Sequence, residues 1–232
     1  MEEVRVKGIV LASVDHKEKD KLLTIFSVEL GKINGILRGV KAPKSKLKYA
    51  SQPFCFASFE LVKQGEYYLV TQVDLIDSFY DLTCDYEKFQ KGSSMLKVCS
   101  KVLRKGIVNP KLFISLINSL KVLTYENFSE HIVVCKFIID FLKAIGYGLN
   151  LDKCIYCGNK LEKVAFFNNK TGDVYCDKCK NPEYIAIEEK DFVILRQLDR
   201  IEIDDLALLK PEPDTIIKLF NLLNYELKRV LN

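Results

Sequence analysis

The stretch Cys154-Ile155-Tyr156-Cys157-Gly158 contains one Cys-x-x-Cys motif, and Cys176-Asp177-Lys178-Cys179 is a second. Residues 158–175 lie between the two motifs. Each motif turns tightly enough to direct two thiolates at one ion, and the pair completes the tetrahedral four-sulfur shell that Zn²⁺ accepts. A catalytic zinc keeps one ligand position open, so the four cysteines predict a structural zinc ion. A redox dithiol pair and a catalytic zinc are the alternative interpretations.

Two short β-prone segments, 164–167 and 173–175, lie between the motifs and are joined by a turn at 168–172. A hairpin of this size is too small to fold alone. Zinc binding contributes about 10–16 kcal/mol in finger peptides and can supply the missing stability. We therefore expect a zinc-binding insert at about 150–182, held by the ion against its neighbours.

The composition suits one large or two smaller globular domains, with 232 residues of which 48% are hydrophobic. The apolar runs are far shorter than the ~18 residues that cross a bilayer, and the first residues do not resemble a signal peptide. The cysteines outside the motifs occur singly among apolar residues, which is typical of reduced core thiols. They are Cys55, Cys84, Cys99 and Cys135. These features predict a cytoplasmic protein without a membrane span.

Strand-like alternation dominates the first eighty residues. The candidate strands are 4–14, 22–28, 32–40, 54–63 and 66–77. Gly31 and the pair Gln64-Gly65 are suited to the tight turns of two hairpins. A closed or nearly closed five-stranded barrel is the economical way to remove sheet edges at this size, so we predict a barrel domain at 1–80.

After Tyr80 the hydrophobic period changes to about 3.6, which predicts a helical domain at 81–232 and an α+β fold overall. Asn109-Pro110, Ser129 and Gly146 supply helix start and stop signals. The expected apolar stripes are Tyr86, Phe89, Leu96, Cys99 and Leu103 on one helix, Leu112, Phe113, Leu116, Ile117, Leu120 and Leu123 on the next, Val133, Phe137, Ile138, Phe141 and Ile145 on a third, and Ile217, Phe220, Leu223, Leu227 and Val230 on the last. Further helices are expected at 188–200 and 214–231.

Positive charge is concentrated in one segment, although the net charge is only +4. No acidic residue occurs from Leu30 to Phe59, whereas 201–214 is acidic. The cations of this stretch are Lys32, Arg38, Lys41, Lys44, Lys46 and Lys48. We interpret them as contacts to the phosphates of single-stranded nucleic acid, with a solvated loop as the alternative. The nearby aromatic residues are Phe54, Phe56, Phe59, Tyr67 and Tyr68, of which alternation should bury about half.

No recognisable catalytic motif accompanies these features. The sequence has no phosphate-binding glycine loop, no Gly-x-Ser-x-Gly motif and no histidine-based metal pair. His16 is expected in a solvated turn and His131 on the surface of a first helical turn. We therefore expect a protein that is not an enzyme. A zinc-dependent hydrolase or deaminase, and a zinc-containing protein–protein adaptor that does not bind nucleic acid, are the competing hypotheses.

Several stretches together resemble the bacterial recombination mediator family RecO. They are Gly8-Ile9-Val10-Leu11, Lys21 to Phe26, Glu29-Leu30-Gly31, Arg38-Gly39-Val40, Lys44-Ser45-Lys46, Gln52-Pro53-Phe54 and both cysteine motifs. The resemblance spans most of the chain, although 84–148 is poorly matched. It implies an N-terminal OB-fold barrel, a helical domain and a zinc module in a protein of recombinational repair.

The resemblance also implies partners and roles for residues. Family members bind single- and double-stranded DNA, anneal complementary strands, act with RecR and help RecA load onto DNA. They also contact the C-terminal tail of single-stranded-DNA-binding protein. Arg38, Lys41, Lys44 and Lys46 match the family's basic stretch, and the four cysteines match its metal positions. For the acidic tail, chemistry alone suggests the cations Lys97, Lys101, Arg104 and Lys105. Such a protein is expected in the cytoplasm, associated with the nucleoid.

Overall fold

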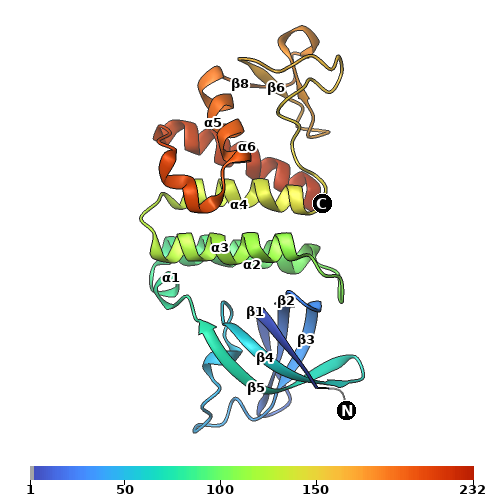
Figure 1. The fold of residues 1–232 in the computed structure, drawn as a ribbon, viewed down its shortest axis with the longest axis vertical. Coiled ribbons are helices and arrows are strands. Elements are labelled where there is room, and N and C mark those ends of the chain that lie inside the picture. Colours follow the sequence, from blue (N-terminus) through green and yellow to red (C-terminus); the bar gives the residue numbers. More distant parts are fainter. Residues whose placement is uncertain (1–2) are drawn as a thin grey trace. The chain divides into compact units, whose positions relative to one another are not determined.

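The computed structural model describes residues 3–232 and forms two compact units, the first ending at Leu116 and the second beginning at Ile117 (Figure 1). Helix α3, Pro110–Tyr125, crosses this boundary. The first two residues of the domain predicted at 1–80 lie outside the described residues. The boundary predicted at residue 80 remains a prediction. The division at Leu116 separates two compact units and does not show which part of the chain folds independently.

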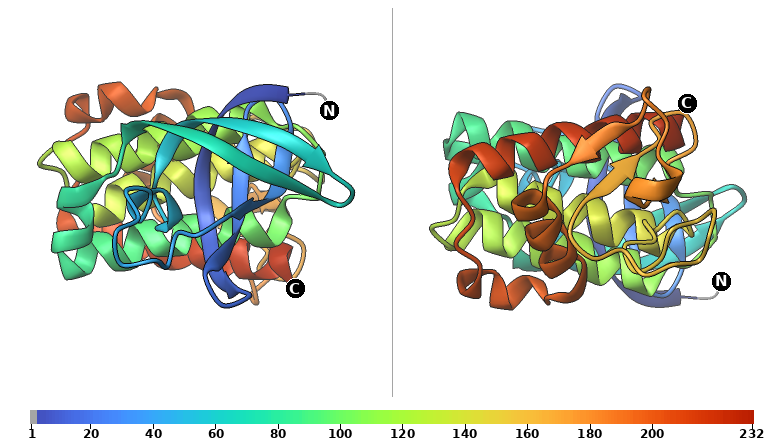
Figure 2. Two further views of the ribbon diagram at one scale, coloured as in Figure 1. Left: turned by 90° about the horizontal axis from the view of Figure 1, so that it is seen from below. Right: turned by 90° about the horizontal axis from the view of Figure 1, so that it is seen from above.

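The first unit contains a closed five-stranded barrel with the strand order β1-β2-β3-β5-β4, as the alternation predicted. Its strands are β1 Glu3–His16, β2 Asp20–Ser27, β3 Gly31–Leu37, β4 Phe56–Gln64 and β5 Tyr67–Asp77. The β4–β5 hairpin extends beyond the other strands (Figure 2). His16 is the last residue of β1 and pairs with Asp20, so the turn expected around it begins one residue later.

The barrel closes where β3 and β5 pair in parallel, at Gly35 with Tyr68 and Ile36 with Leu69. Residues in β3 alternate strictly between buried and half-buried positions, as a strand with one face in a core must. A Cβ at Gly35 would lie 3.0 Å from Val70 Cγ2 and 3.2 Å from Ile25 Cδ1. The missing side chain therefore lets the two closing strands approach over a filled interior.

Helices α1, Tyr80–Cys84, and α2, Tyr86–Val102, follow the barrel in the first unit. Leu96, Cys99 and Leu103 are buried as predicted, but Tyr86 and Phe89 are 73% and 42% exposed. The buried face of α2 is centred near Gly92 and Met95. Tyr86 lies roughly 120° around the helix from Gly92, at 100° per residue, so the predicted stripe is correct from Leu96 onward and Tyr86 lies off the buried face.

Helix α3 begins at the predicted Asn109-Pro110 signal. The Asn109 side chain accepts a hydrogen bond from the Leu112 N–H at 3.0 Å, and Pro110 occupies the first helical position. All six residues of the predicted apolar face are buried. Phe113 packs edge-on against Phe26, with ring centroids 5.2 Å apart, and joins the start of α3 to the barrel.

The second unit packs helices α4 Glu130–Ala144, α5 Glu189–Arg200 and α6 Pro213–Leu231 with a small sheet. The sheet has the order β7-β6-β8, with β6 Ala165–Phe167, β7 Val174–Tyr175 and β8 Ile185–Ile187. Figure 2 shows these strands beside α6 in its second view. No helix among residues 3–232 is both long and apolar enough to cross a membrane.

The ends of α4 agree with the sequence signals. Ser129 occupies the N-cap position, although its side chain makes no capping hydrogen bond. At the other end Gly146 has a φ of +86°, and the Tyr147 N–H donates to the Leu142 carbonyl at 2.8 Å. The ring of His131, expected on the surface, packs edge-on against Phe220, with centroids 4.6 Å apart.

The stripe predicted on α6 is correct at Leu223 and Leu227 and wrong at Ile217, which is 51% exposed. The neighbouring Ile216 is buried in its place, together with Leu219. The buried face therefore starts one residue earlier than the sequence pattern suggested.

Replacement of Gly31 by alanine should destabilise the first unit more than replacement of Gly39. Both glycines have a positive φ, +66° and +64°. A Cβ at Gly31 would overlap the Ile107 carbonyl, whereas one at Gly39 meets no atom within 4 Å. We expect Gly39→Ala to cost about 1 kcal/mol of unfolding free energy for the backbone conformation alone, and Gly31→Ala roughly 2 kcal/mol more. Urea denaturation measures both; equal losses would contradict a close approach at Gly31.

Candidate metal centre and nucleic-acid surface

The four cysteines of the two motifs form one cluster in the second unit. Their Sγ atoms all lie within 4.8 Å of one another, and those of Cys157 and Cys176 are 3.7 Å apart. A tetrahedral zinc with bonds of about 2.3 Å has sulfur atoms about 3.8 Å apart along each edge. A disulfide would need about 2 Å. The donor set therefore fits a metal ion bound by four thiolates.

Backbone hydrogen bonds fix the loops that carry these thiols. In the first loop the Gly158 N–H donates to the Cys154 carbonyl at 3.0 Å, and the Cys154 N–H donates to the Asn159 carbonyl at 2.8 Å. Gly158 adopts a φ of +70°, which glycine tolerates best. In the second loop the Cys179 N–H donates to the Cys176 carbonyl at 3.0 Å. Both pairs of thiols are thus positioned by their own short loops.

The pKa values of two thiols in the cluster, Cys154 and Cys179, are shifted in opposite directions. Burial opposes ionisation of Cys154, but hydrogen bonds from the backbone at Cys157, Cys176 and Tyr156 lower its pKa to about 6. Burial, followed by hydrogen bonds with the other three thiols, raises the pKa of Cys179 to about 12. Ionisation of Cys154 is thus favoured and that of Cys179 opposed, and a bound cation is what would allow both of these thiols to ionise.

Ion pairs connect the segment before the cluster to α5. The Asp152 carboxylate lies 2.6 Å from Arg200 Nη2 and 3.5 Å from Arg196 Nη2. Arg196 also donates to the Leu161 carbonyl at 3.3 Å, and Leu161 is fully buried. These contacts hold the first cysteine loop on the helical part of the second unit.

The hairpin between the motifs rests on α6. Arg229 donates to both carboxylate oxygens of Glu226, at 2.7 Å and 2.5 Å, and Glu226 is only 1% exposed. A Cβ at Gly172, in the hairpin turn, would overlap this pair. Sequence reasoning missed this contact, although a Glu and an Arg three residues apart on a largely apolar helix face were a visible signal.

Sequence reasoning also missed β8, which completes the sheet. Ile185 pairs with Phe167 and Ile187 with Ala165. Three residues of alternating apolar character are too short a signal to predict a strand. On the opposite edge, the Ile155 N–H donates to the Val174 carbonyl at 3.1 Å, so the first cysteine loop protects β7.

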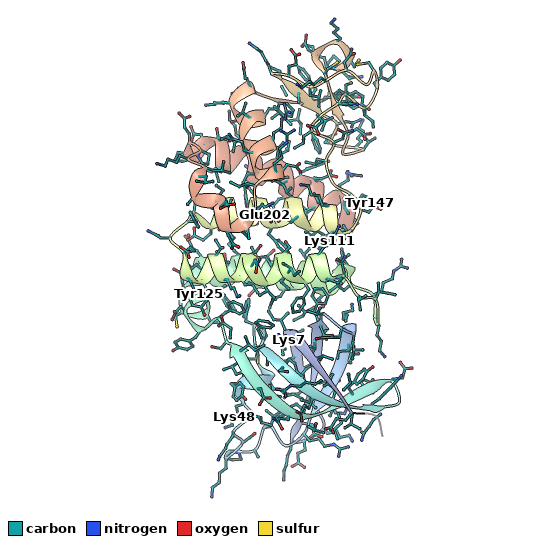
Figure 3. All side chains as sticks on the ribbon, in the orientation of Figure 1. Lys7, Lys48, Lys111, Tyr125, Tyr147 and Glu202 are labelled. Carbon is teal, nitrogen blue, oxygen red and sulfur yellow. The ribbon has the colours of Figure 1, made fainter. Side chains whose placement is uncertain are left out.

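The six predicted DNA-contacting cations fall into two groups. Lys32 Nζ donates to the Ser100 carbonyl at 2.8 Å, Lys41 forms an ion pair with Asp15 at 2.8 Å, and Lys48 donates to the Pro43 carbonyl at 3.1 Å. The ion pair with Lys41 lowers the pKa of Asp15. Arg38, Lys44 and Lys46 are exposed, and within residues 3–232 none of them forms an ion pair. Figure 3 shows Lys48 on the loop that projects from the barrel.

Most of the aromatic candidates near this segment belong to the core. Phe54, Phe56 and Phe59 are buried, whereas Tyr67 is 39% exposed. Tyr49, which directly follows the basic loop and was not predicted as a site residue, is 37% exposed and donates its hydroxyl to the Val73 carbonyl at 3.1 Å. Tyr49 and Tyr67 are therefore the exposed aromatic residues nearest in sequence to the cations.

The four cations suggested for an acidic peptide lie on α2 and just after it. Lys97, Lys101 and Arg104 are exposed. Lys105 forms an ion pair with Glu66 at 2.9 Å, and its ammonium lies 5.8 Å from the centre of the Tyr67 ring. Their role in binding a partner remains a prediction.

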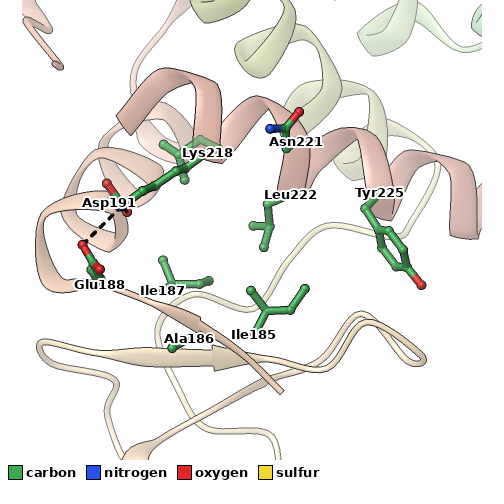
Figure 4. A pocket seen from close by; sticks show the side chains of 10 residues that line it. Ile185, Ala186, Ile187, Glu188, Asp191, Lys218, Asn221, Leu222 and Tyr225 are labelled. Carbon is green, nitrogen blue, oxygen red and sulfur yellow. Dashed lines mark hydrogen bonds and ion pairs between the residues drawn. The ribbon is translucent and has the colours of Figure 1, made fainter. Parts of the chain in front are cut away.

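A groove of about 460 Å³ lies between β8 and α6 (Figure 4). Ile185, Ile187 and Leu222 supply its apolar walls. Lys218 at its end lies 3.4 Å from Glu188 and 3.5 Å from Asp191, and these carboxylates raise its pKa. The groove thus offers apolar surface beside a cation that is already neutralised.

Comparisons with known proteins match both parts of the chain. The family model described as recombination protein O N terminal matches residues 1–79, and that described as recombination protein O C terminal matches 84–232. The chain is 29% identical to the DNA repair protein RecO of Clostridium perfringens (strain 13 / Type A) over 223 residues, 96% of this chain and 91% of the relative. It is 32% identical to the DNA repair protein RecO of Syntrophomonas wolfei subsp. wolfei (strain DSM 2245B / Goettingen) over 178 residues, 76% of this chain and 70% of the relative.

Replacement of Cys176 by serine should abolish stoichiometric metal binding and lower the melting temperature, because three sulfurs cannot complete the shell that holds the hairpin. Elemental analysis and thermal denaturation measure the two effects. Cys84→Ser is the matched control, since Cys84 is exposed and lies outside the cluster. Full metal content in Cys176→Ser, or its loss in Cys84→Ser, would contradict the assignment of the ligands.

Removal of one member of the Glu226–Arg229 pair should cost more than removal of both. Arg229→Met leaves a buried carboxylate without its cation, for which we expect a loss of about 3 kcal/mol of unfolding free energy. The double variant Glu226→Met/Arg229→Met should remain within about 1 kcal/mol of the native chain, because no charge is then buried alone. Chemical denaturation of the metal-loaded proteins tests this order; additive losses would show that the pair does not act as a unit.

Proposed function

Because the chain belongs to the recombination protein O (RecO) family of DNA repair proteins, we propose that it is a non-enzymatic, DNA-binding recombination mediator that anneals complementary single strands. The observation that carries the proposal is the cation set Arg38, Lys44 and Lys46. These side chains are exposed on an acid-free segment beside a closed barrel, and within the described residues they have no carboxylate partner. They are therefore available to phosphates.

We further propose that the metal is zinc and that its role is structural. Cys154, Cys157, Cys176 and Cys179 would hold the ion, which supplies the positive charge that four adjacent thiolates require. Four sulfur ligands leave no position for water or substrate, which argues against a zinc-dependent hydrolase or deaminase. X-ray absorption that found fewer than four sulfur neighbours would reopen that alternative.

The partners proposed for this chain follow from its family. They are single- and double-stranded DNA, RecR, and the C-terminal tail of single-stranded-DNA-binding protein, with loading of RecA onto coated DNA as the outcome. For the tail we propose the exposed cations of α2 and its end, Lys97, Lys101, Arg104 and Lys105, because an acidic peptide needs cations beside apolar surface. A protein with these partners acts in the cytoplasm, at the nucleoid.

Reversal of charge at Lys44 and Lys46 should weaken binding to a single-stranded oligonucleotide at low salt and flatten its salt dependence. Each phosphate contact adds about 0.7 to the slope of log affinity against log salt on single strands, so loss of two contacts should reduce the slope by about 1.4. Fluorescence anisotropy over a range of salt concentrations measures both quantities. The rate of annealing of complementary strands should fall in the same variant.

The matched control is Lys63→Glu/Lys111→Glu, which changes the net charge equally in the first unit but outside the basic segment. It should retain most of the affinity and slope. Wild-type behaviour of Lys44→Glu/Lys46→Glu would show that the loop is merely solvated. Absence of salt-sensitive binding in the native chain would favour the second candidate, a zinc-containing protein–protein adaptor without direct nucleic-acid binding.

A further inference from the structure

The first cysteine loop exposes two large apolar side chains. Tyr156 is 80% exposed and Ile155 is 51% exposed. Both lie between Cys154 and Cys157, two members of the thiol cluster, and the loop backbone is closed by the hydrogen bond from the Gly158 N–H to the Cys154 carbonyl. An aromatic ring held in this way loses little conformational entropy when it binds a partner.

Two lysines face each other at the base of this loop. Lys153 and Lys160 form an isolated antiparallel bridge. Like charges placed directly opposite in such a pair destabilise it. Among residues 3–232 neither lysine has a carboxylate within ion-pair distance, whereas Lys170 and Lys180 nearby are paired with Glu183 and Asp177. The fold therefore tolerates a repulsion that an anionic ligand would relieve.

A hollow of about 440 Å³ continues this positive surface beside Cys176. Lys160, Lys163 and Lys178 line it. The carboxylates of Glu162 and Asp177 also line it, and Asp177 forms an ion pair with Lys180 at 2.6 Å. Lys163 reaches Glu189 only at 4.0 Å, with both side chains largely exposed, which is a weak interaction.

We propose that the tip of this loop is a second contact for single-stranded nucleic acid, in which Tyr156 stacks on a base while Lys153 and Lys160 contact the flanking phosphates. The proposal rests on the DNA binding proposed above and adds a surface in the other compact unit. The combination selects the ligand: an acidic peptide would satisfy the lysines but carries a stacking ring only at an occasional aromatic residue, whereas every nucleotide carries one in its base.

A second surface gives the chain a physical route to annealing. A protein that brings two complementary strands together must hold each of them, at least transiently. The basic segment of the first unit can hold one strand, and the cysteine-loop tip of the second unit supplies a separate place for another. Sequence-independent stacking is suited to this task, because the strands to be paired are arbitrary.

The chain itself makes a selective optical test possible. It contains no tryptophan, so Tyr156→Trp introduces a single indole at the tip of the loop. Oligothymidylate should quench this indole saturably, whereas an oligonucleotide of abasic sites should bind more weakly and leave the indole unquenched. Tyr225→Trp is the control, because Tyr225 is 47% exposed on α6, outside the loop. Anisotropy of labelled oligonucleotide in the same samples reports binding independently.

Two further variants separate stacking from charge. Tyr156→Ala should weaken binding of oligothymidylate about fivefold, the lower end for loss of one stacked base, and leave the abasic oligonucleotide unaffected. Lys153→Gln/Lys160→Gln should weaken binding of both oligonucleotides. Metal content should be unchanged in each variant, since none of these side chains is a thiol ligand.

The proposal is overturned if anisotropy shows binding while the Tyr156→Trp indole is not quenched, or if the abasic oligonucleotide or an oligoglutamate peptide quenches it equally. It is also overturned if the double lysine variant loses its metal, because the lysines would then serve only to balance the charge of the thiolates. These outcomes leave the proposed function intact if Lys44→Glu/Lys46→Glu still weakens binding. Absence of any oligonucleotide binding overturns both proposals.

Discussion

The second unit depends on keeping four thiols within 4.8 Å of one another. Its sheet consists of strands of three, two and three residues, too short to be stable from their own hydrogen bonds and buried side chains. Both edges of the hairpin are instead attached elsewhere, one through Ile155 in the first cysteine loop and the other through β8, which leads into α5. A cation bound by these thiols would therefore stabilise the loops, the sheet and the contact of Gly172 with α6.

The first unit is organised by a different constraint, the closure of the barrel. Closure requires a close approach at Gly35, where β3 meets β5, and a second close approach joins Gly31 of β3 to the Ile107 carbonyl in the loop after α2. None of these contacts involves the thiol cluster. The barrel interior and the pairing of all five strands belong to this unit alone, so the basic segment sits on a frame whose stability has its own source.

Sequence reasoning succeeded where a local pattern determines structure by itself. Period-two alternation located the five strands, and the spacing of the cysteines identified the cluster. It failed where packing decides: Tyr86 and Ile217 were the first residues of their predicted stripes, and both are exposed, because the neighbouring elements determine how far the buried side of a helix extends. The bond from Lys32 to Ser100 was out of reach for the same reason, since it depends on how elements pack in three dimensions.

The distribution of partners among the cations limits what the barrel can do alone. Within residues 3–232, Lys41 is paired with the carboxylate of Asp15, whereas Lys32 and Lys48 donate to backbone carbonyls, which leave their charge in place. If the five cations of the segment that have no carboxylate partner within residues 3–232 each contacted one phosphate, the magnitude of the salt slope on single strands would be about 3.5. Ionic contacts of this kind weaken as the salt concentration rises. If the chain holds two strands long enough to pair them, as proposed, contacts beyond the basic segment would strengthen its hold, and stacking is the kind of contact that salt weakens least.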